Sequence, residues 1–206
     1  MKQLLLDIQP PAPQTLTNFI IGQNAEALHS IKQALSGAKE ARFIYLWGAQ
    51  GSGKSHLLSA CKAANMRVAD DVHLLDNEAQ IALFNTYNQI KSLNSEGLGG
   101  TLITAGLYAP TQMHLRDDLA TRLAWGLVYQ LQPLTDEEKA QALKTHAFER
   151  GMKLPDEVVD YCLRYLRRDL PTLMAVLDAL DVWSLTEKKP VTVPMLKKLL
   201  QLDLAL

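Results

Sequence analysis

Residues 48–55 read Gly-Ala-Gln-Gly-Ser-Gly-Lys-Ser, a complete G-x-x-x-x-G-K-[ST] phosphate-binding loop. The loop follows an apolar run at 43–47 that predicts a strand, and it precedes a helical pattern at 56–64. In this setting backbone N–H groups and the positive end of the following helix converge on bound phosphates. An ordinary glycine turn between a strand and a helix is the alternative. The complete motif in its strand–loop–helix context favours a nucleotide site.

Each part of the loop has an expected task. Lys54 is expected to reach the β- and γ-phosphates, and the hydroxyl of Ser55 is expected to bind Mg²⁺. The expected cofactors are therefore ADP or ATP together with Mg²⁺. The loop residues that would hold the nucleotide are Gly48, Gln50, Gly51, Ser52, Gly53, Lys54 and Ser55.

Composition limits the class of protein. A formal net charge of −1 gives no global basic field, which argues against nucleic acid or an anionic membrane as the main direct partner. Cys61 and Cys162 lie in apolar helical patterns, so we expect both to pack in a core in a reducing compartment. The five histidines are scattered and make no zinc-like cluster. With no signal peptide and no apolar run long enough to span a membrane, the sequence predicts a soluble, cytoplasmic protein.

Strands and helices alternate in the first two thirds of the chain. This alternation predicts a parallel sheet with helices on both faces. The helix expected at 77–93 has Ile81, Phe84, Tyr87 and Ile90 at steps of three residues, a pattern that we interpret as a core-facing stripe. The expected strands are 43–47, 66–69, 101–105 and 127–132.

The pattern becomes purely helical after Pro133. Thr135 and Glu138 form the sequence signature of a capping box, and the helix that they begin is expected to end at Gly151. Pro155 is expected in the first turn of the next helix, and two further helices follow. The predicted organisation is a leader at 1–18, an α/β nucleotide-binding domain at 19–133 and a helical lid at 134–206.

A carboxylate pair follows the short strand at 66–69. Asp70 and Asp71 stand where a phosphate-loop protein needs a carboxylate to organise Mg²⁺, usually at the end of a neighbouring strand. Taken alone, the pair fits equally well as helix-capping acids at a strand–helix turn. With the phosphate loop present, the metal-organising interpretation is favoured, and Asp70 with Ser55 becomes the predicted Mg²⁺ site.

Arg122 lies just before the last predicted strand, in a place from which it could reach a γ-phosphate on a neighbouring subunit. Spacing alone does not establish this arginine-finger role. A surface arginine paired with Asp117 or Asp118 is the alternative, and by spacing it would be favoured.

A separate signal stands at the N-terminus. Residues 3–8 read Gln-Leu-Leu-Leu-Asp-Ile, an apolar hexamer set apart from the fold by Pro10, Pro11 and Pro13. Such a hexamer could dock in a partner's groove, or it could add a strand or a staple to this protein's own surface. The residues alone favour neither.

Together these segments resemble the DnaA-type AAA+ family. Within it the closer resemblance is to the shortened branch of regulatory inactivators of DnaA (Hda), because the chain stops where DnaA continues into a DNA-binding domain. The segments at 18–22, 68–72 and 122–127 look like the family's adenine-side segment, its Walker B strand and its box carrying the arginine finger. The segment at 130–139 looks like the start of its helical lid. The resemblance covers nearly the whole chain.

The resemblance assigns partners and roles. The hexamer resembles the motif by which that branch docks on the replicative sliding clamp, the β subunit of DNA polymerase III, with Gln3, Leu4, Leu6 and Ile8 as contact residues. Arg122 would act in trans on ATP held by DnaA and so switch the initiator off. DNA would be reached only through the clamp, no membrane is involved, and a homo-oligomer is compatible with the family.

Three departures from the family bear on the chain's own catalysis. About fifteen residues separate Lys54 from Asp70, too few for the strand and helix usually found there, so we expect four parallel strands with one edge strand missing. The two sensor positions fall on Leu107 and Pro171, and Arg167 or Arg168 could substitute for the second. Without charged sensors the transition state of hydrolysis is poorly stabilised. The sequence therefore predicts a regulator rather than an enzyme, with a self-sufficient AAA+ ATPase acting as helicase or clamp loader as the alternative.

Overall fold

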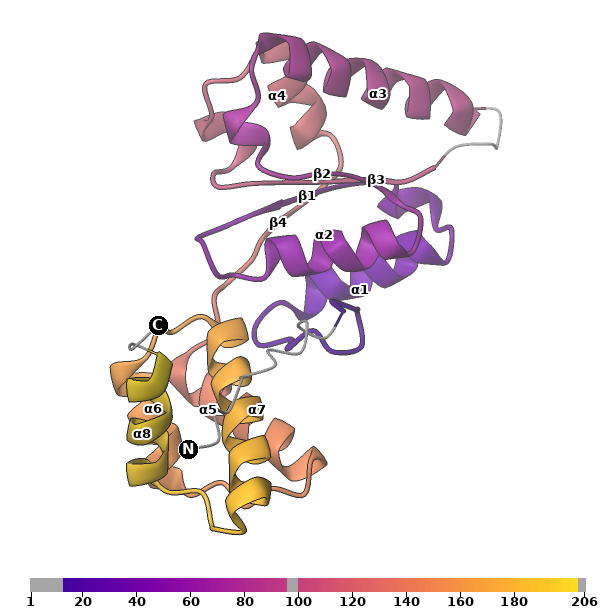
Figure 1. Ribbon diagram of the computed structural model, residues 1–206. Coiled ribbons are helices and arrows are strands. Elements are labelled where there is room, and N and C mark those ends of the chain that lie inside the picture. Colours follow the sequence, from indigo (N-terminus) through magenta and orange to yellow (C-terminus); the bar gives the residue numbers. More distant parts are fainter. Residues whose placement is uncertain (1–12, 96–99, 204–206) are drawn as a thin grey trace. The chain divides into compact units, whose positions relative to one another are not determined.

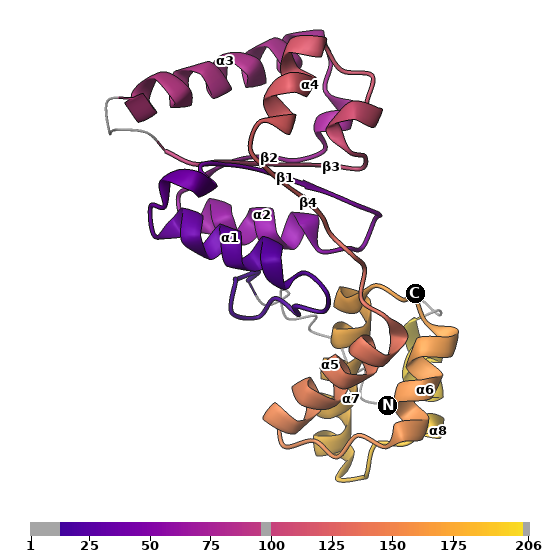
Figure 2. The same ribbon diagram turned by 180° about the vertical axis from the view of Figure 1, so that it is seen from behind.

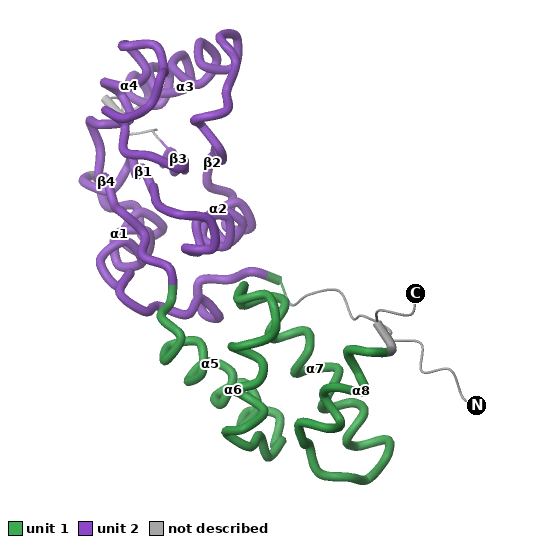
Figure 3. Tube along the Cα trace, turned by 90° about the vertical axis from the view of Figure 1, so that its left-hand side faces the viewer, with its two compact units in different colours: residues 1–13, 134–206 green, residues 14–133 purple. Residues whose placement is uncertain are grey.

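The computed structural model describes residues 13–95 and 100–203 (Figure 1). The chain divides between Pro133 and Leu134 into two compact units, which Figure 3 shows in different colours. One unit spans residues 14–133 and is α/β. The other is assigned residues 1–13 and 134–206, and it is helical in the described part from residue 134 onward. The structure therefore contains both the α/β part and the helical part that the sequence predicts.

The α/β unit is built on a parallel sheet of four strands in its described residues, in the order β2-β3-β1-β4. The central strands are β1 (Phe43–Trp47) and β3 (Leu102–Gly106), and β3 is buried along its whole length. The edges are β2 (Arg67–Ala69) and β4 (Leu127–Gln130). The prediction of four parallel strands is confirmed, and the strand that leads to Asp70 is an edge strand.

Helices cover both faces of this sheet, as Figures 1 and 2 show from opposite sides. One face carries α1 (Ala25–Leu35) and α2 (Lys54–Ala63) over a core that includes Ile31 and Leu57. The other face carries α3 (Asn77–Ser95) and α4 (Asp117–Ala124). Leu16 packs against the α1–α2 core and the Thr15 carbonyl oxygen lies 2.9 Å from His56 Nε2, so this segment is tied to the α/β unit.

The expected core stripe of α3 is wrong at Ile81. This side chain is 37% exposed, whereas Tyr87 and Ile90 are buried together with Leu83. An α-helix has 3.6 residues per turn, so the nine residues from Ile81 to Ile90 make two and a half turns. Steps of three therefore place the first and last members of the pattern on opposite faces of the helix.

Gly126 allows the connection between α4 and β4 to pass close to the backbone of the neighbouring strand β1. A Cβ at this position would overlap the backbone carbonyl of Phe43, which belongs to β1 and cannot move without disturbing the sheet. We expect Gly126→Ala to lower the free energy of unfolding by about 2–3 kcal/mol through overpacking. Urea unfolding measures this, with Gly100→Ala as the control because a Cβ at Gly100 meets open space. Equal stability of the two variants would contradict the prediction.

The helical unit consists of α5 (Asp136–Glu149), α6 (Asp156–Tyr165), α7 (Leu170–Glu187) and α8 (Val193–Asp203). The capping box is confirmed: Thr135 Oγ1 accepts from the Glu138 N–H at 3.2 Å, and the Thr135 N–H donates to Glu138 Oε2 at 2.8 Å. Gly151 follows α5 with φ of +71°, as expected for a residue just past a helix end. Pro155 is the N-cap of α6 rather than part of its first turn, because its ψ of 145° is extended.

The two cysteines behave as predicted, one in each core. Both thiols are free and buried. Burial raises the pKa of Cys61 to about 12 and the pKa of Cys162 to about 11. Neither side chain is therefore a nucleophile near neutral pH.

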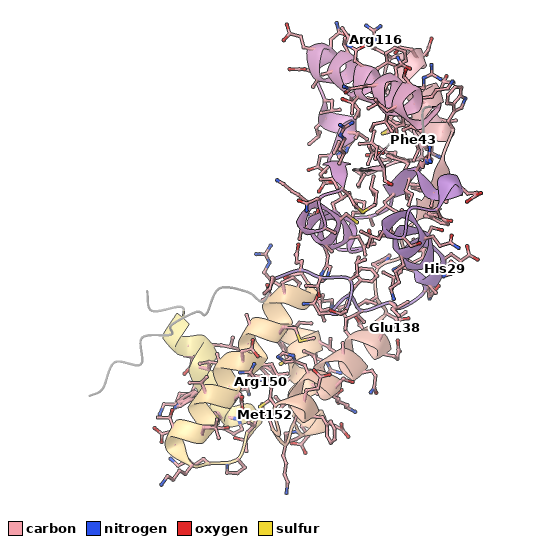
Figure 4. All side chains as sticks on the ribbon, turned by 90° about the vertical axis from the view of Figure 1, so that its right-hand side faces the viewer. His29, Phe43, Arg116, Glu138, Arg150 and Met152 are labelled. Carbon is pink, nitrogen blue, oxygen red and sulfur yellow. The ribbon has the colours of Figure 1, made fainter. Side chains whose placement is uncertain are left out.

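An ionic network joins α5 to α7 inside the helical unit (Arg150 is labelled in Figure 4). Arg150 Nε lies 3.0 Å from Asp181 Oδ2, and its Nη1 lies 3.1 Å from Asp178 Oδ1, which also lies 2.7 Å from His146 Nε2. The Asp181 side chain is only 11% exposed, so its negative charge is stabilised mainly by the ion pair with this arginine. The hydrogen bond to Asp181 correspondingly raises the pKa of Arg150.

We expect Arg150→Leu to destabilise the helical unit by about 2 kcal/mol, because it leaves a charged hydrogen-bonding group without its partner. Thermal unfolding of the whole chain measures the loss. Arg164→Leu is the control, since Arg164 is exposed on α6. If the two variants unfold at the same temperature, the network does not contribute as inferred.

Candidate nucleotide site and arginine finger

The phosphate-loop sequence forms the connection between β1 and α2. β1 ends at Trp47 and α2 begins at Lys54, two residues before the helix start expected from the sequence. Gly51 and Gly53 have φ of +81° and +95°, in the region where only glycine is unstrained. A Cβ at Gly53 would also collide with the Phe19 ring. The glycines of the motif are therefore required by the shape of the loop itself.

Lys54 is buried in this loop. Its Nζ donates to the carbonyl oxygens of Gly48 at 2.7 Å and Ala49 at 2.9 Å. Burial lowers the pKa of Lys54, and the nearby charges of Asp70 and Asp71 oppose that change. Backbone carbonyl oxygens of the loop thus fix the Lys54 ammonium group in the place where the phosphates of a nucleotide are expected to bind.

Ser55 and Asp70 meet beside the loop. Ser55 Oγ donates to Asp70 Oδ2 at 2.9 Å, and the other carboxylate oxygen accepts from the Asp71 N–H at 2.8 Å. Asp70 follows the last residue of β2, so the edge strand delivers it to the first turn of α2. A hydroxyl and a carboxylate are oxygen ligands of the kind that Mg²⁺ prefers, and α2 has no side-chain cap over its first N–H groups. The residues present therefore fit a nucleotide with Mg²⁺.

Asp71 does not join this pair. Its backbone is left-handed, with φ of 47°, and its side chain is 63% exposed with Oδ1 4.0 Å from His73 Nδ1. Within the described residues no side-chain hydrogen bond or ion pair connects Asp71 to Ser55 or Lys54. Asp71 contributes negative charge near Lys54 rather than a ligand beside Ser55.

Arg122 lies on α4, on the face of the sheet opposite α2. The alternative interpretation, in which it pairs with Asp117 or Asp118, is wrong. Asp118 instead pairs with Arg116, whose Nη2 lies 2.9 Å from Asp118 Oδ2. This hydrogen bond holds the pKa of Asp118 below its usual value. In the part of the chain that the structure describes, no carboxylate forms an ion pair with Arg122. Its guanidinium carbon instead lies 4.0 Å from the centre of the Trp125 ring.

Comparison with known proteins adds a family for the helical unit and a fold for the whole. Residues 136–200 match the family model described as the lid domain of Hda. Domain III of the replication initiation protein DnaA from Thermotoga maritima superposes with a TM-score of 0.70 at 22% identity, over 93% of this chain and 98% of that one. The chain has the fold of a DnaA-type AAA+ protein, and its residues 136–200 are similar to the lid domain of Hda.

Two further solved structures agree with this fold. AMPPCP-bound DnaA from Aquifex aeolicus gives a TM-score of 0.67 at 22% identity, and this chain spans 66% of that chain's length. The RuvB Holliday junction branch migration motor of Thermotoga maritima gives 0.59 at 16% identity, over 90% of this chain and 70% of that one. At these identities the likeness shows the architecture, and the AAA+ fold predicted from the sequence is confirmed.

The two residues that the sequence predicted at the sensor positions, Leu107 and Pro171, have apolar side chains. Leu107 follows β3 and is half-buried, and Pro171 lies in the first turn of α7. The arginines considered as substitutes are exposed and near acids of their own unit: Arg168 Nη1 lies 3.5 Å from Asp136, and Arg167 Nε lies 3.9 Å from Asp169. Neither Leu107 nor Pro171 has a charged or hydrogen-bonding side chain.

Sequence reasoning missed the residues around Arg122. The guanidinium of Arg122 lies over the rings of Trp125 and Phe84, and Lys91 lies over the Trp125 ring. The available signal was the spacing of Arg122 and Trp125, three residues apart at the end of a helix and hence on one face. Gln3, Leu4, Leu6 and Ile8, predicted to bind the clamp, lie outside the described residues.

The described residues contain neither a metal-binding cluster nor a membrane-spanning helix. Within 13–95 and 100–203, no group of three or more histidine, cysteine or acidic side chains is arranged to hold a metal ion. No helix in those ranges is both long enough and apolar enough to cross a bilayer.

Proposed function

We propose that this chain binds ADP or ATP with Mg²⁺ and regulates the initiation of chromosome replication by stimulating hydrolysis of ATP held by DnaA. The observation that carries the proposal is Arg122, a cation that no described carboxylate neutralises, in a DnaA-type fold that carries an Hda lid. An arginine presented to a neighbour's γ-phosphate accelerates hydrolysis by roughly 10³–10⁵ in well-studied cases. The direct test is loss of ATP from DnaA in the presence of this chain.

The nucleotide serves as a structural ligand in this proposal. Lys54, Ser55 and Asp70 would hold it, and bound Mg²⁺ would neutralise phosphate charge. The first N–H groups of α2 point into the same loop. The chain itself is then a regulator whose own ATPase activity is slow.

The apolar sensor positions support slow turnover. Phosphoryl transfer depends on charge positioned around the transition state, and Leu107 and Pro171 provide none. The alternative function, a self-sufficient AAA+ ATPase acting as helicase or clamp loader, requires such charges. Multiple-turnover ATP hydrolysis by the chain alone distinguishes the two: rates of several per second would support the ATPase.

Docking on the DNA-loaded sliding clamp completes the proposal. It rests on residues 3–8, whose sequence resembles the clamp-binding motif of the family, and it makes DNA contact indirect. The formal net charge of −1 agrees with the lack of a direct electrostatic attraction to DNA. We place this activity in the cytoplasm.

We expect Gln3→Ala combined with Leu4→Ala to weaken clamp binding by about 30-fold or more, the effect of losing an interface hot spot of about 2 kcal/mol. Fluorescence anisotropy of the labelled chain with clamp measures the affinity. Leu5→Ala is the matched control, because position 5 is not a contact position of the motif. Unchanged affinity of the double variant would remove the docking motif.

A further inference from the structure

The side chain of Arg122 is held by aromatic rings rather than by acids. Its guanidinium carbon lies 4.0 Å from the centre of the Trp125 ring and 5.5 Å from the centre of the Phe84 ring. Trp125 is the C-cap of α4 and is 54% exposed, whereas Phe84 comes from α3 and is half-buried. Two helices thus contribute one ring each to the surroundings of one arginine.

A second cation lies on the same indole. Lys91 Nζ, from α3, lies 4.1 Å from the centre of the Trp125 ring, so that one ring interacts with two positive charges. Among the described residues no carboxylate pairs with Lys91 or with Arg122. The electron-rich face of tryptophan attracts each cation without cancelling its charge. The result is a local positive potential on a protein whose net charge is near zero.

Arg116, the N-cap residue of α4, shows the contrast. Arg116 binds Asp118 through both Nε at 3.2 Å and Nη2 at 2.9 Å, which uses the guanidinium's planar edge. An arginine held in this way must break a bidentate pair before it can bind a phosphate. Stacking on an aromatic ring uses the face of the guanidinium and leaves its N–H donors available at the edge. Arg122 is therefore held in position without having its hydrogen-bonding capacity consumed.

We propose that Trp125 is a positioning residue that holds Arg122 extended, charged and ready to bind the triphosphate of a neighbouring molecule. The proposal rests on the function proposed above. Phe84 supports the guanidinium from α3, and Lys91 adds to the attraction of an anionic ligand. A finger held in place before it meets its phosphate loses less side-chain freedom in the transition state than a mobile one.

Trp125→Leu is expected to lower the maximal rate of stimulated ATP hydrolysis by about tenfold, because one exposed cation–π contact accounts for a few-fold and misorientation of the finger adds to it. The concentration of this chain that gives half-maximal stimulation should stay the same. Trp125→Phe keeps a ring under the guanidinium and should restore most of the rate. Phe148→Leu, which removes an exposed ring from α5, is the matched control and should have no effect.

Nuclear magnetic resonance of the chain alone provides a readout that needs no partner. Ring currents of the aromatic side chain at position 125 should shift the δ-methylene protons of Arg122 upfield in the parent and in Trp125→Phe, and most of this shift should be lost in Trp125→Leu, where only the more distant Phe84 ring remains. A parent spectrum without the shift would overturn the proposal. So would full activity of Trp125→Leu, or a change confined to the half-maximal concentration, which would make Trp125 a contact of the interface. If Arg122→Ala itself stimulates normally, the finger lies elsewhere and the role of Trp125 fails with it, whereas a parent chain that does not stimulate hydrolysis at all would remove the proposed function.

Discussion

Replacing Arg122 by alanine is expected to reduce stimulated hydrolysis of DnaA-bound ATP by about 10³-fold or more. The physical reason is that a positive charge aimed at the γ-phosphate stabilises charge that develops only in the transition state. Arg122 can supply this charge, because no carboxylate of the described residues pairs with it. Single-turnover hydrolysis of ATP preloaded on DnaA, with clamp on DNA present, measures the effect.

The N-cap residue of α4 offers a matched control for this variant. Arg116→Ala removes an arginine of equal charge that is already bound to Asp118, so stimulation should stay within about twofold of the parent. Arg122→Lys keeps a positive charge but cannot form the planar, bidentate contacts of a guanidinium, and it should recover only part of the rate. Stimulation by Arg122→Ala at the parent's level would show that the finger is elsewhere.

Loss of the loop lysine is expected to have the second-largest effect. Lys54→Met should weaken binding of ADP with Mg²⁺ by about 100-fold, which corresponds to about 3 kcal/mol for a charged hydrogen bond to phosphate. Its Nζ also bonds to the carbonyl oxygens of Gly48 and Ala49, so the variant loses both a ligand contact and an internal support of the loop. Isothermal titration calorimetry measures the affinity.

Lys62→Met is the appropriate comparison for this variant, because Lys62 is an exposed lysine in the last turn of the same helix. Its affinity should equal the parent's. Thermal unfolding of both variants without nucleotide separates a damaged loop from a lost phosphate contact. Unaltered ADP affinity in Lys54→Met would mean that residues 48–55 do not form the nucleotide site.

The sheet and its phosphate loop were predictable because their signals are local. A glycine-rich motif between a strand and a helix allows few backbone shapes, and the positive φ of Gly51 and Gly53 agrees with that requirement. The α3 stripe was predicted less well because steps of three drift around a helix, which left Ile81 exposed and brought Leu83 into the core. Periodicity gives the face of a long helix only when steps of three and four alternate.

The Ser55–Asp70 contact was also anticipated, since the end of a neighbouring strand is where a carboxylate can meet the loop. The surroundings of Arg122 were not. Asp118 and Arg122 are four residues apart, the spacing of a helical ion pair, but Asp118 lies near the start of α4 and is bound by Arg116 instead. The spacing does not show which of two arginines an acid will bind. It also does not show that Lys91 of α3 lies over Trp125 and that Phe84 of α3 lies near the guanidinium of Arg122.

The site of hydrolysis is the most direct test of the account. Two arrangements are compared, both with DNA-loaded clamp. In the first, DnaA holds ATP labelled at the γ-phosphate and this chain holds unlabelled ADP. In the second, this chain holds the labelled ATP and DnaA holds AMPPCP. We expect rapid release of labelled phosphate in the first arrangement and almost none in the second. Rapid release in the second arrangement, with none in the first, would contradict this expectation and make this chain an ATPase in its own right.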